Sequence, residues 1–155
     1  MSPDQSLAVI ESPYSADSIV AFARNVRYAR AAVLDAIQLG YSPLASHLLY
    51  TQEGILSEAT PDERARGIAC GHVPYQYSTK VYDMQPNDGY ARVACLVYPD
   101  LGITEGMKAG IKEAKTYGCH VYHRTLSHRP DLLALPTEAQ ALNIITAGLS
   151  LPRGL

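Results

Sequence analysis

The chain has few of the features that mark secreted or membrane proteins. Its three cysteines are an odd number without paired spacing, which argues against a disulfide framework. Two of them, Cys95 and Cys119, lie in apolar runs where cysteine usually packs as a small hydrophobe. No run reaches the roughly 18 apolar residues of a membrane-spanning helix, and the first residues lack the basic and apolar regions of a signal peptide. We therefore expect a soluble, cytoplasmic protein without a membrane partner.

The chain also lacks an excess of basic residues. Its formal net charge is -2, so there is no positive field to hold a phosphate backbone, and we expect no nucleic-acid partner. Nicotinamide fingerprints, P-loops and Ser-His-Asp signatures are missing as well, which leaves dehydrogenase, kinase and triad-hydrolase functions without residue-level support.

What is present is enough apolar sequence for one core: 47% of 155 residues are hydrophobic, which fits one domain over residues 1–155. Apolar runs alternate with amphipathic helical patterns, as expected of an open α/β sheet. Strands are predicted at 7–10, 41–45, 93–98 and 119–123, and helices at 15–40, 60–70, 104–117 and 136–149.

One segment interrupts this alternation. Residues 75–84 and 90–98 both read as extended runs, and the pair Asp88-Gly89 between them is typical of a hairpin turn. We therefore predict an inserted β-hairpin over about 75–98. Its tyrosines are suited to an interface between subunits or to a lid over a neighbouring site, and the sequence leaves both open.

The most informative stretch joins a strand to a helix. The apolar run 93–98 ends in a Pro-Asp-Leu-Gly turn at 99–102, and a helical pattern begins at Thr104. In an open α/β sheet this junction lies at the carboxyl edge of the strands, where small ligands bind. The chain is therefore predicted to handle a small molecule.

Several segments together resemble the nucleoside 2-deoxyribosyltransferase-like family, in particular an uncharacterised branch common in phage genomes. They are VIESPYS at 9–15, Asn25, GYSPLASH at 40–47 and DLGITEGMKAGI at 100–111. The resemblance implies a single-domain, Rossmann-like three-layer α/β fold with a central, mostly parallel sheet. It also implies a homo-oligomer that cleaves or exchanges the N-glycosidic bond of a nucleoside or nucleotide, without a cofactor.

One position departs from that family. The nucleophilic glutamate usually stands two residues before the glycine that is Gly110 here, and Lys108 takes its place. Glu105, one helical turn earlier, is the hypothetical nucleophile, with Lys108 keeping it ionised. The alternative is an ordinary exposed ion pair at the start of a helix. Asp100 matches the family's acidic residue near the sugar hydroxyls, although it also suits a plain turn.

Other polar residues near the ends of the predicted strands form the remaining candidate site. Each also has a structural explanation: the serines suit a helix N-cap, and His47 suits a satisfied structural histidine. The predicted ligand-binding residues are Ser12, Tyr14, Ser15, Asn25, His47, Gly102, Thr104 and Lys108.

We expect no metal site. His120 and His123 point to opposite faces of a strand, and no compact cysteine and histidine pattern supplies a closed set of ligands.

Three functions remain open at this point. The first is N-glycosidic cleavage or deoxyribosyl transfer on a nucleoside or nucleotide. The second is non-catalytic binding of nucleotides or nucleotide-derived signalling molecules, which Lys108 favours because it replaces the expected glutamate. The third is an oligomeric structural protein without a ligand.

Overall fold

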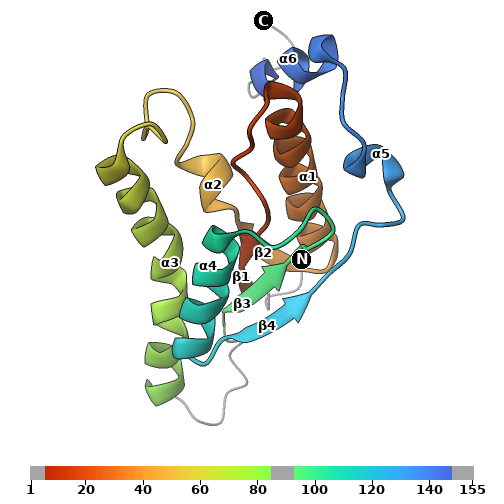
Figure 1. Ribbon diagram of the computed structural model, residues 1–155. Coiled ribbons are helices and arrows are strands. Elements are labelled where there is room, and N and C mark those ends of the chain that lie inside the picture. Colours follow the sequence, from red (N-terminus) through yellow and green to blue (C-terminus); the bar gives the residue numbers. More distant parts are fainter. Residues whose placement is uncertain (1–5, 85–92, 148–155) are drawn as a thin grey trace, which may run out of the picture.

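The computed structural model describes residues 6–84 and 93–147 (Figure 1). Its elements in chain order are β1 (Ser6–Glu11), α1 (Ile19–Gln38), β2 (Tyr41–Leu44), α2 (Ser46–Leu49), α3 (Pro61–Met84), β3 (Ala94–Val97), α4 (Glu105–Thr116), β4 (His120–His123), α5 (Pro130–Leu133) and α6 (Glu138–Thr146). The four strands form one sheet in the order β2-β1-β3-β4, and every neighbouring pair is parallel.

Helices cover both faces of this sheet (Figure 1). Side chains of a strand alternate between the faces. Ala8 and Ile10 therefore pack in the cluster beneath α1, while Val9 packs with Tyr75 of α3 and Met107 of α4. The short helices α5 and α6 pack against α1. The chain thus has the predicted Rossmann-like three-layer α/β fold.

The strand order places a topological switch point at the centre of the sheet. From β1 the chain passes through α1 to β2 on one side, whereas β3 pairs with the other side of β1. The connections that leave the carboxyl ends of β1 and β3 therefore diverge. Such a point is where ligands bind in open α/β sheets.

The first helix begins later than the sequence indicated. Ser18 is its N-cap, and its side chain accepts a hydrogen bond from the Ala21 amide at 3.2 Å. Ser15, the predicted cap, lies three residues earlier in an exposed connection. The helix ends before Gly40, whose φ of 88° is readily adopted only by glycine.

The predicted hairpin is wrong over residues 75–84. The helix predicted to stop near Gly71 continues as α3 to Met84 and passes through Pro74. Packing explains the continuation: Tyr75 is fully buried, and Gly71 lies so close to α2 that a Cβ there would be 2.5 Å from Ser46 Oγ. Residues 85–92, which include the predicted turn, lie outside the described residues.

The second half of the predicted hairpin also has a different partner. Ala94–Val97 pairs in parallel with β1 as a fully buried central strand. The last helix is shorter than the predicted 136–149: α6 spans Glu138–Thr146 and begins with a capping box of Thr137 and Gln140. None of the helices described in 6–84 and 93–147 has both the length and the apolar character needed to cross a bilayer.

Candidate functional site

Two predicted site residues meet where β1 ends. Ser12, directly after β1, is buried, and its Oγ lies 2.8 Å from Nε2 of His47 on α2. Burial lowers the pKa of His47 to about 4, so the imidazole is neutral near pH 7. The pair therefore joins the end of β1 to α2 without adding a charge.

The connection between β1 and α1 is held by side chains on both of its sides. The Tyr14 hydroxyl donates to Thr51 Oγ1 at 2.8 Å, and the Tyr14 ring packs edge-on against Phe22 with the ring centroids 5.0 Å apart. Asn25 Nδ2 donates to the carbonyl oxygens of Tyr14 and Ser15 at 3.0 and 3.3 Å. Tyr14 is thereby fixed with its ring toward α1 and its hydroxyl toward the segment after α2.

An open cleft of about 840 Å³ lies between this connection and the segment that precedes and enters α3. Residues that line it include Tyr14, Phe22, Thr51, Glu53, Glu58 and Glu63. No lysine, arginine or histidine of the described ranges is among the lining residues. The cleft therefore combines aromatic rings and hydroxyls with carboxylates.

Two of these carboxylates have partners at the wall of the cleft. Glu63 accepts a hydrogen bond from the Ser57 amide at 2.7 Å, and Glu58 lies 3.7 Å from Nε of Arg64. Arg64 lines a smaller adjoining hollow of about 60 Å³, which also reaches His47. The hollow shares Glu58 and Glu63 with the lining of the cleft and borders His47 on its other side.

Asp100 follows β3 as predicted, and its carboxylate is occupied by the protein itself. It accepts hydrogen bonds from the Tyr28 hydroxyl at 2.6 Å, the Thr125 hydroxyl at 2.5 Å and the Leu126 amide at 2.8 Å. Although burial opposes the change, these donors lower its pKa. Asp100 therefore ties α1 and the segment after β4 to the end of β3.

The other predicted residues of the β3–α4 junction lie at the surface. Gly102 has a φ of 96°, and Thr104 is the N-cap of α4, accepting from the Met107 amide at 3.3 Å. The Glu105 and Lys108 side chains are 88% and 60% exposed and pair at 2.6 Å. This is the geometry of an exposed helix ion pair, and neither side chain lines the cleft.

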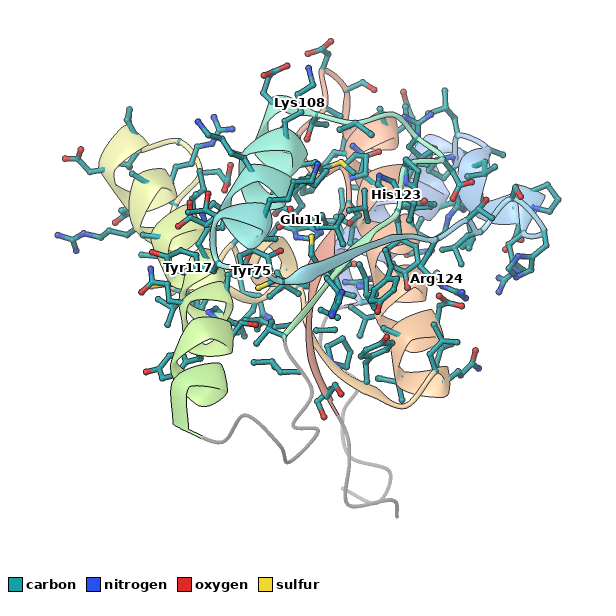
Figure 2. The ribbon with its side chains drawn as sticks, turned by 90° about the horizontal axis from the view of Figure 1, so that it is seen from below. Glu11, Tyr75, Lys108, Tyr117, His123 and Arg124 are labelled. Atoms are coloured by element: carbon teal, nitrogen blue, oxygen red, sulfur yellow. The ribbon has the colours of Figure 1, made fainter. Side chains whose placement is uncertain are left out.

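One titratable group at the switch point was not predicted. Glu11, the last residue of β1, turns its carboxyl into the layer beneath α3 and α4, where the Tyr75 hydroxyl donates to Oε1 at 2.8 Å. A Cβ on Gly110 of α4 would overlap this carboxyl. In Figure 2 Glu11 lies near the centre of the molecule beside Tyr75, whereas Lys108 projects at its edge.

Burial dominates the electrostatics of Glu11. It raises the pKa of the carboxyl to about 7, and the hydrogen bond from Tyr75 partly opposes that rise. The sequence does contain a clue, because Glu11 shares a strand face with Val9 two residues earlier, and that face is covered. The predicted strand ended at residue 10, so Glu11 was not among the predicted site residues.

Metal ligation has no geometric support in the described ranges. Among residues 6–84 and 93–147, no group of three or more His, Cys, Asp or Glu side chains is arranged to hold an ion. His120 and His123 are both exposed on β4, and His120 stacks on Tyr122 with the ring centroids 6.0 Å apart.

Fold and site together define the class: a parallel α/β domain with a cleft at the carboxyl edge and a buried carboxyl at the switch point. A known family matches the part of the chain that contains the four-stranded sheet. A family described as a domain of unknown function (DUF7768) matches residues 6–124, and the chain belongs to it. No curated protein and no solved structure matches the chain.

Proposed function

We propose that the chain acts on a nucleoside or nucleotide, cleaving its N-glycosidic bond or transferring its deoxyribosyl group. The observation that carries the proposal is the cleft of about 840 Å³ beside the end of β1. Its size is that of small-molecule sites, which lie at this edge of parallel sheets. The resemblance of residues 9–15 and 40–47 to nucleoside 2-deoxyribosyltransferase-like proteins supports the same ligand class, because both segments border this edge.

The chemistry of the lining favours an unphosphorylated nucleoside within that class. The rings of Tyr14 and Phe22 offer apolar surface to a base. The carboxylates of Glu53, Glu58 and Glu63 accept hydrogen bonds from amino or hydroxyl groups but repel a phosphate. A nucleoside therefore fits this lining better than its monophosphate does.

Binding without catalysis is the second candidate. The observation that favours it is the pairing of Glu105 with Lys108 at the surface, since an exposed carboxylate is not positioned against a sugar carbon. A nucleotide-derived ligand would then be held without being cleaved.

The first experiment incubates the purified protein with a panel of deoxynucleosides and their monophosphates. Free base is followed by chromatography, and thermal unfolding is followed in parallel. Tyr14→Ala removes a ring of the cleft, and Tyr122→Ala removes an exposed ring on β4 as a matched control. We expect base release in the wild type and in Tyr122→Ala, and its loss in Tyr14→Ala.

Other outcomes separate the candidates. Thermal stabilisation by the ligand without base release supports the binding protein and contradicts the enzyme. No stabilisation and no release with any member of the panel contradicts both. Assembly as a homo-oligomer and a cytoplasmic location stay predictions; thiols at Cys70, Cys95 and Cys119 suit a reducing compartment.

A further inference from the structure

The charges that line the cleft are all of one sign. Glu53, Glu58 and Glu63 each contribute a carboxylate, and no lysine, arginine or histidine of the described ranges lines the cleft with them. Arg64 lies 3.7 Å from Glu58, but it lines the adjoining hollow and not the cleft. A neutral ligand would therefore leave most of this negative charge without a counter-charge.

The same cleft has an aromatic wall. Tyr14 and Phe22 both line it, with their ring centroids 5.0 Å apart, and the hydrogen bond to Thr51 at 2.8 Å fixes the Tyr14 ring. Burial raises the pKa of Tyr14, the hydrogen bond with Thr51 opposes this rise, and the charge of Glu58 adds to it. The field of Glu58 thus reaches the aromatic wall, so a carboxylate and a ring can act on the same ligand.

Aromatic rings combined with carboxylates suit a cation whose charge is spread over a flat, apolar group. Ring faces attract cations, and a carboxylate adds a Coulomb attraction that is stronger where water is partly excluded. A small ammonium ion would fill little of a cleft of about 840 Å³, so its size favours a larger ligand. A nucleoside whose base is methylated on a ring nitrogen has both the positive charge and the size.

We propose that the cleft prefers nucleosides with a positively charged base, such as 7-methylguanosine. This inference rests on the N-glycosidic function proposed above and narrows its substrate class.

The positive charge also suits the proposed reaction. When the C1′–N bond of such a nucleoside breaks, the bonding pair passes to the base and cancels its charge. The base then leaves as a neutral molecule without taking up a proton, while water bonds to C1′ and releases a proton to the solvent. Cleavage of such a substrate therefore needs no general acid in the lining of the cleft.

The first test compares three nucleosides of similar shape. 7-Methylguanosine carries the charge, guanosine lacks both the charge and the methyl group, and 7-deaza-7-methylguanosine has the methyl group without the charge. Isothermal titration calorimetry of the full chain should give a dissociation constant about tenfold lower for the cation than for either neutral compound. Choline, a small organic cation, should bind more weakly than 7-methylguanosine.

Two glutamine variants locate this preference. Glu53→Gln removes a carboxylate of the cleft with little change of shape, and Glu138→Gln, on exposed α6, is the matched control. Glu53→Gln should weaken the binding of 7-methylguanosine about threefold and leave that of guanosine unchanged. Glu138→Gln should change neither. Raising the salt concentration from about 50 to about 500 mM should weaken the binding of the cation alone.

The outcomes separate this inference from the proposed function. Equal affinity for the three nucleosides, with base released from unmodified deoxynucleosides, overturns the inference and leaves the proposed function standing. Choline binding as tightly as 7-methylguanosine also overturns it, because charge alone would then explain the preference. A Glu53→Gln variant that keeps the full preference contradicts the role of the carboxylates. Neither binding nor base release with any nucleoside, methylated or not, defeats the proposed function as well.

Discussion

At the residue scale, two buried groups give the stability of the protein opposite dependences on pH. Burial raises the pKa of Glu11 in the folded protein to about 7 from its usual value of 4.5. As the pH rises between these values, the unfolded chain has lost a proton that the folded chain still holds, so the free energy of unfolding falls. His47 has a folded pKa of about 4 against 6.5, so its contribution falls as the pH decreases through that window.

Glu11→Gln should remove the first of these dependences. Relative to the wild type, the free energy of unfolding of the variant should increase between pH 4.5 and about 7, by about 3 kcal/mol in total. Urea unfolding across this range measures the difference, in which the contribution of His47 cancels. A difference between the two proteins that stays constant with pH would show that the Glu11 carboxyl is not desolvated.

Gly110 and Glu11 should also be coupled in stability. A methyl group on Gly110 would overlap the Glu11 carboxyl, so Gly110→Ala should cost roughly 1–3 kcal/mol, as overpacking does. In a Glu11→Ala background the same change should cost less, because the space is empty. Chemical unfolding of the two single variants and the double variant gives the coupling energy, and additive effects would contradict the contact.

The part of this site that lies at the ends of the strands could be predicted from the sequence. Ser12 and His47 follow two strands whose carboxyl ends share an edge, and the fold brings them to 2.8 Å. Asp100 was expected to meet a ligand, but Thr125 and Leu126 occupy it from a segment whose return the local pattern does not reveal. The contact of Glu11 with Tyr75 was missed because Tyr75 was predicted to lie in a strand, whereas it reaches the Glu11 carboxyl from α3.

At the scale of elements, α3 shows how tertiary packing overrides local preference. Gly71 and Pro74 both disfavour a helix, and the tyrosine-rich stretch after them favours a strand. The helix continues nonetheless, since it buries Tyr75 against the sheet and Gly71 against α2. This burial involves residues that are distant in the sequence, so a local sequence pattern does not predict it.

Two glycines of α3 should respond oppositely to alanine. At Gly71 a Cβ would lie 2.5 Å from Ser46 Oγ, whereas at Gly67 its nearest neighbour would be Leu56 Cδ1 at 3.5 Å, an ordinary contact. Gly67→Ala should therefore stabilise the protein by up to about 1 kcal/mol through helix propensity. Gly71→Ala should lower its melting temperature instead, by crowding α2. Thermal unfolding of both variants measures the two changes in melting temperature. Equal changes in the two variants would contradict the close approach of α2 and α3.

At the scale of the whole molecule, the class of fold was predictable although one element was wrong. Strands at 7–10, 41–45, 93–98 and 119–123 were each confirmed within two residues. Buried parallel strands are continuous apolar runs, and these stand out from the amphipathic helices between them. The wrong prediction concerned α3, a helix that covers one face of the sheet. It left the four predicted strands of the sheet unaffected.

A bound ligand should stabilise the folded protein, and we expect an uncharged nucleoside to do so more than a negatively charged nucleotide. At 100 times its dissociation constant a ligand adds about 2.7 kcal/mol, which raises the melting temperature by several degrees. We expect 2′-deoxyadenosine to produce a larger shift than its 5′-monophosphate at equal concentration. Replacing Glu53 and Glu58 together by glutamine should narrow that difference. A larger shift with the monophosphate in the wild type would contradict the charge argument.

The order of the strands has a consequence for how the chain is made. The two central strands pair Ala8 with Ala94, so β1 cannot complete its ladder until β3 has left the ribosome. Until then β1 can pair only with β2 among the described strands, and the other edge of β1 stays open to other chains. Such distant pairing slows folding and prolongs exposure to aggregation. The centre of the sheet therefore closes only once β3 has emerged, and the edge pair of β3 and β4 closes after it.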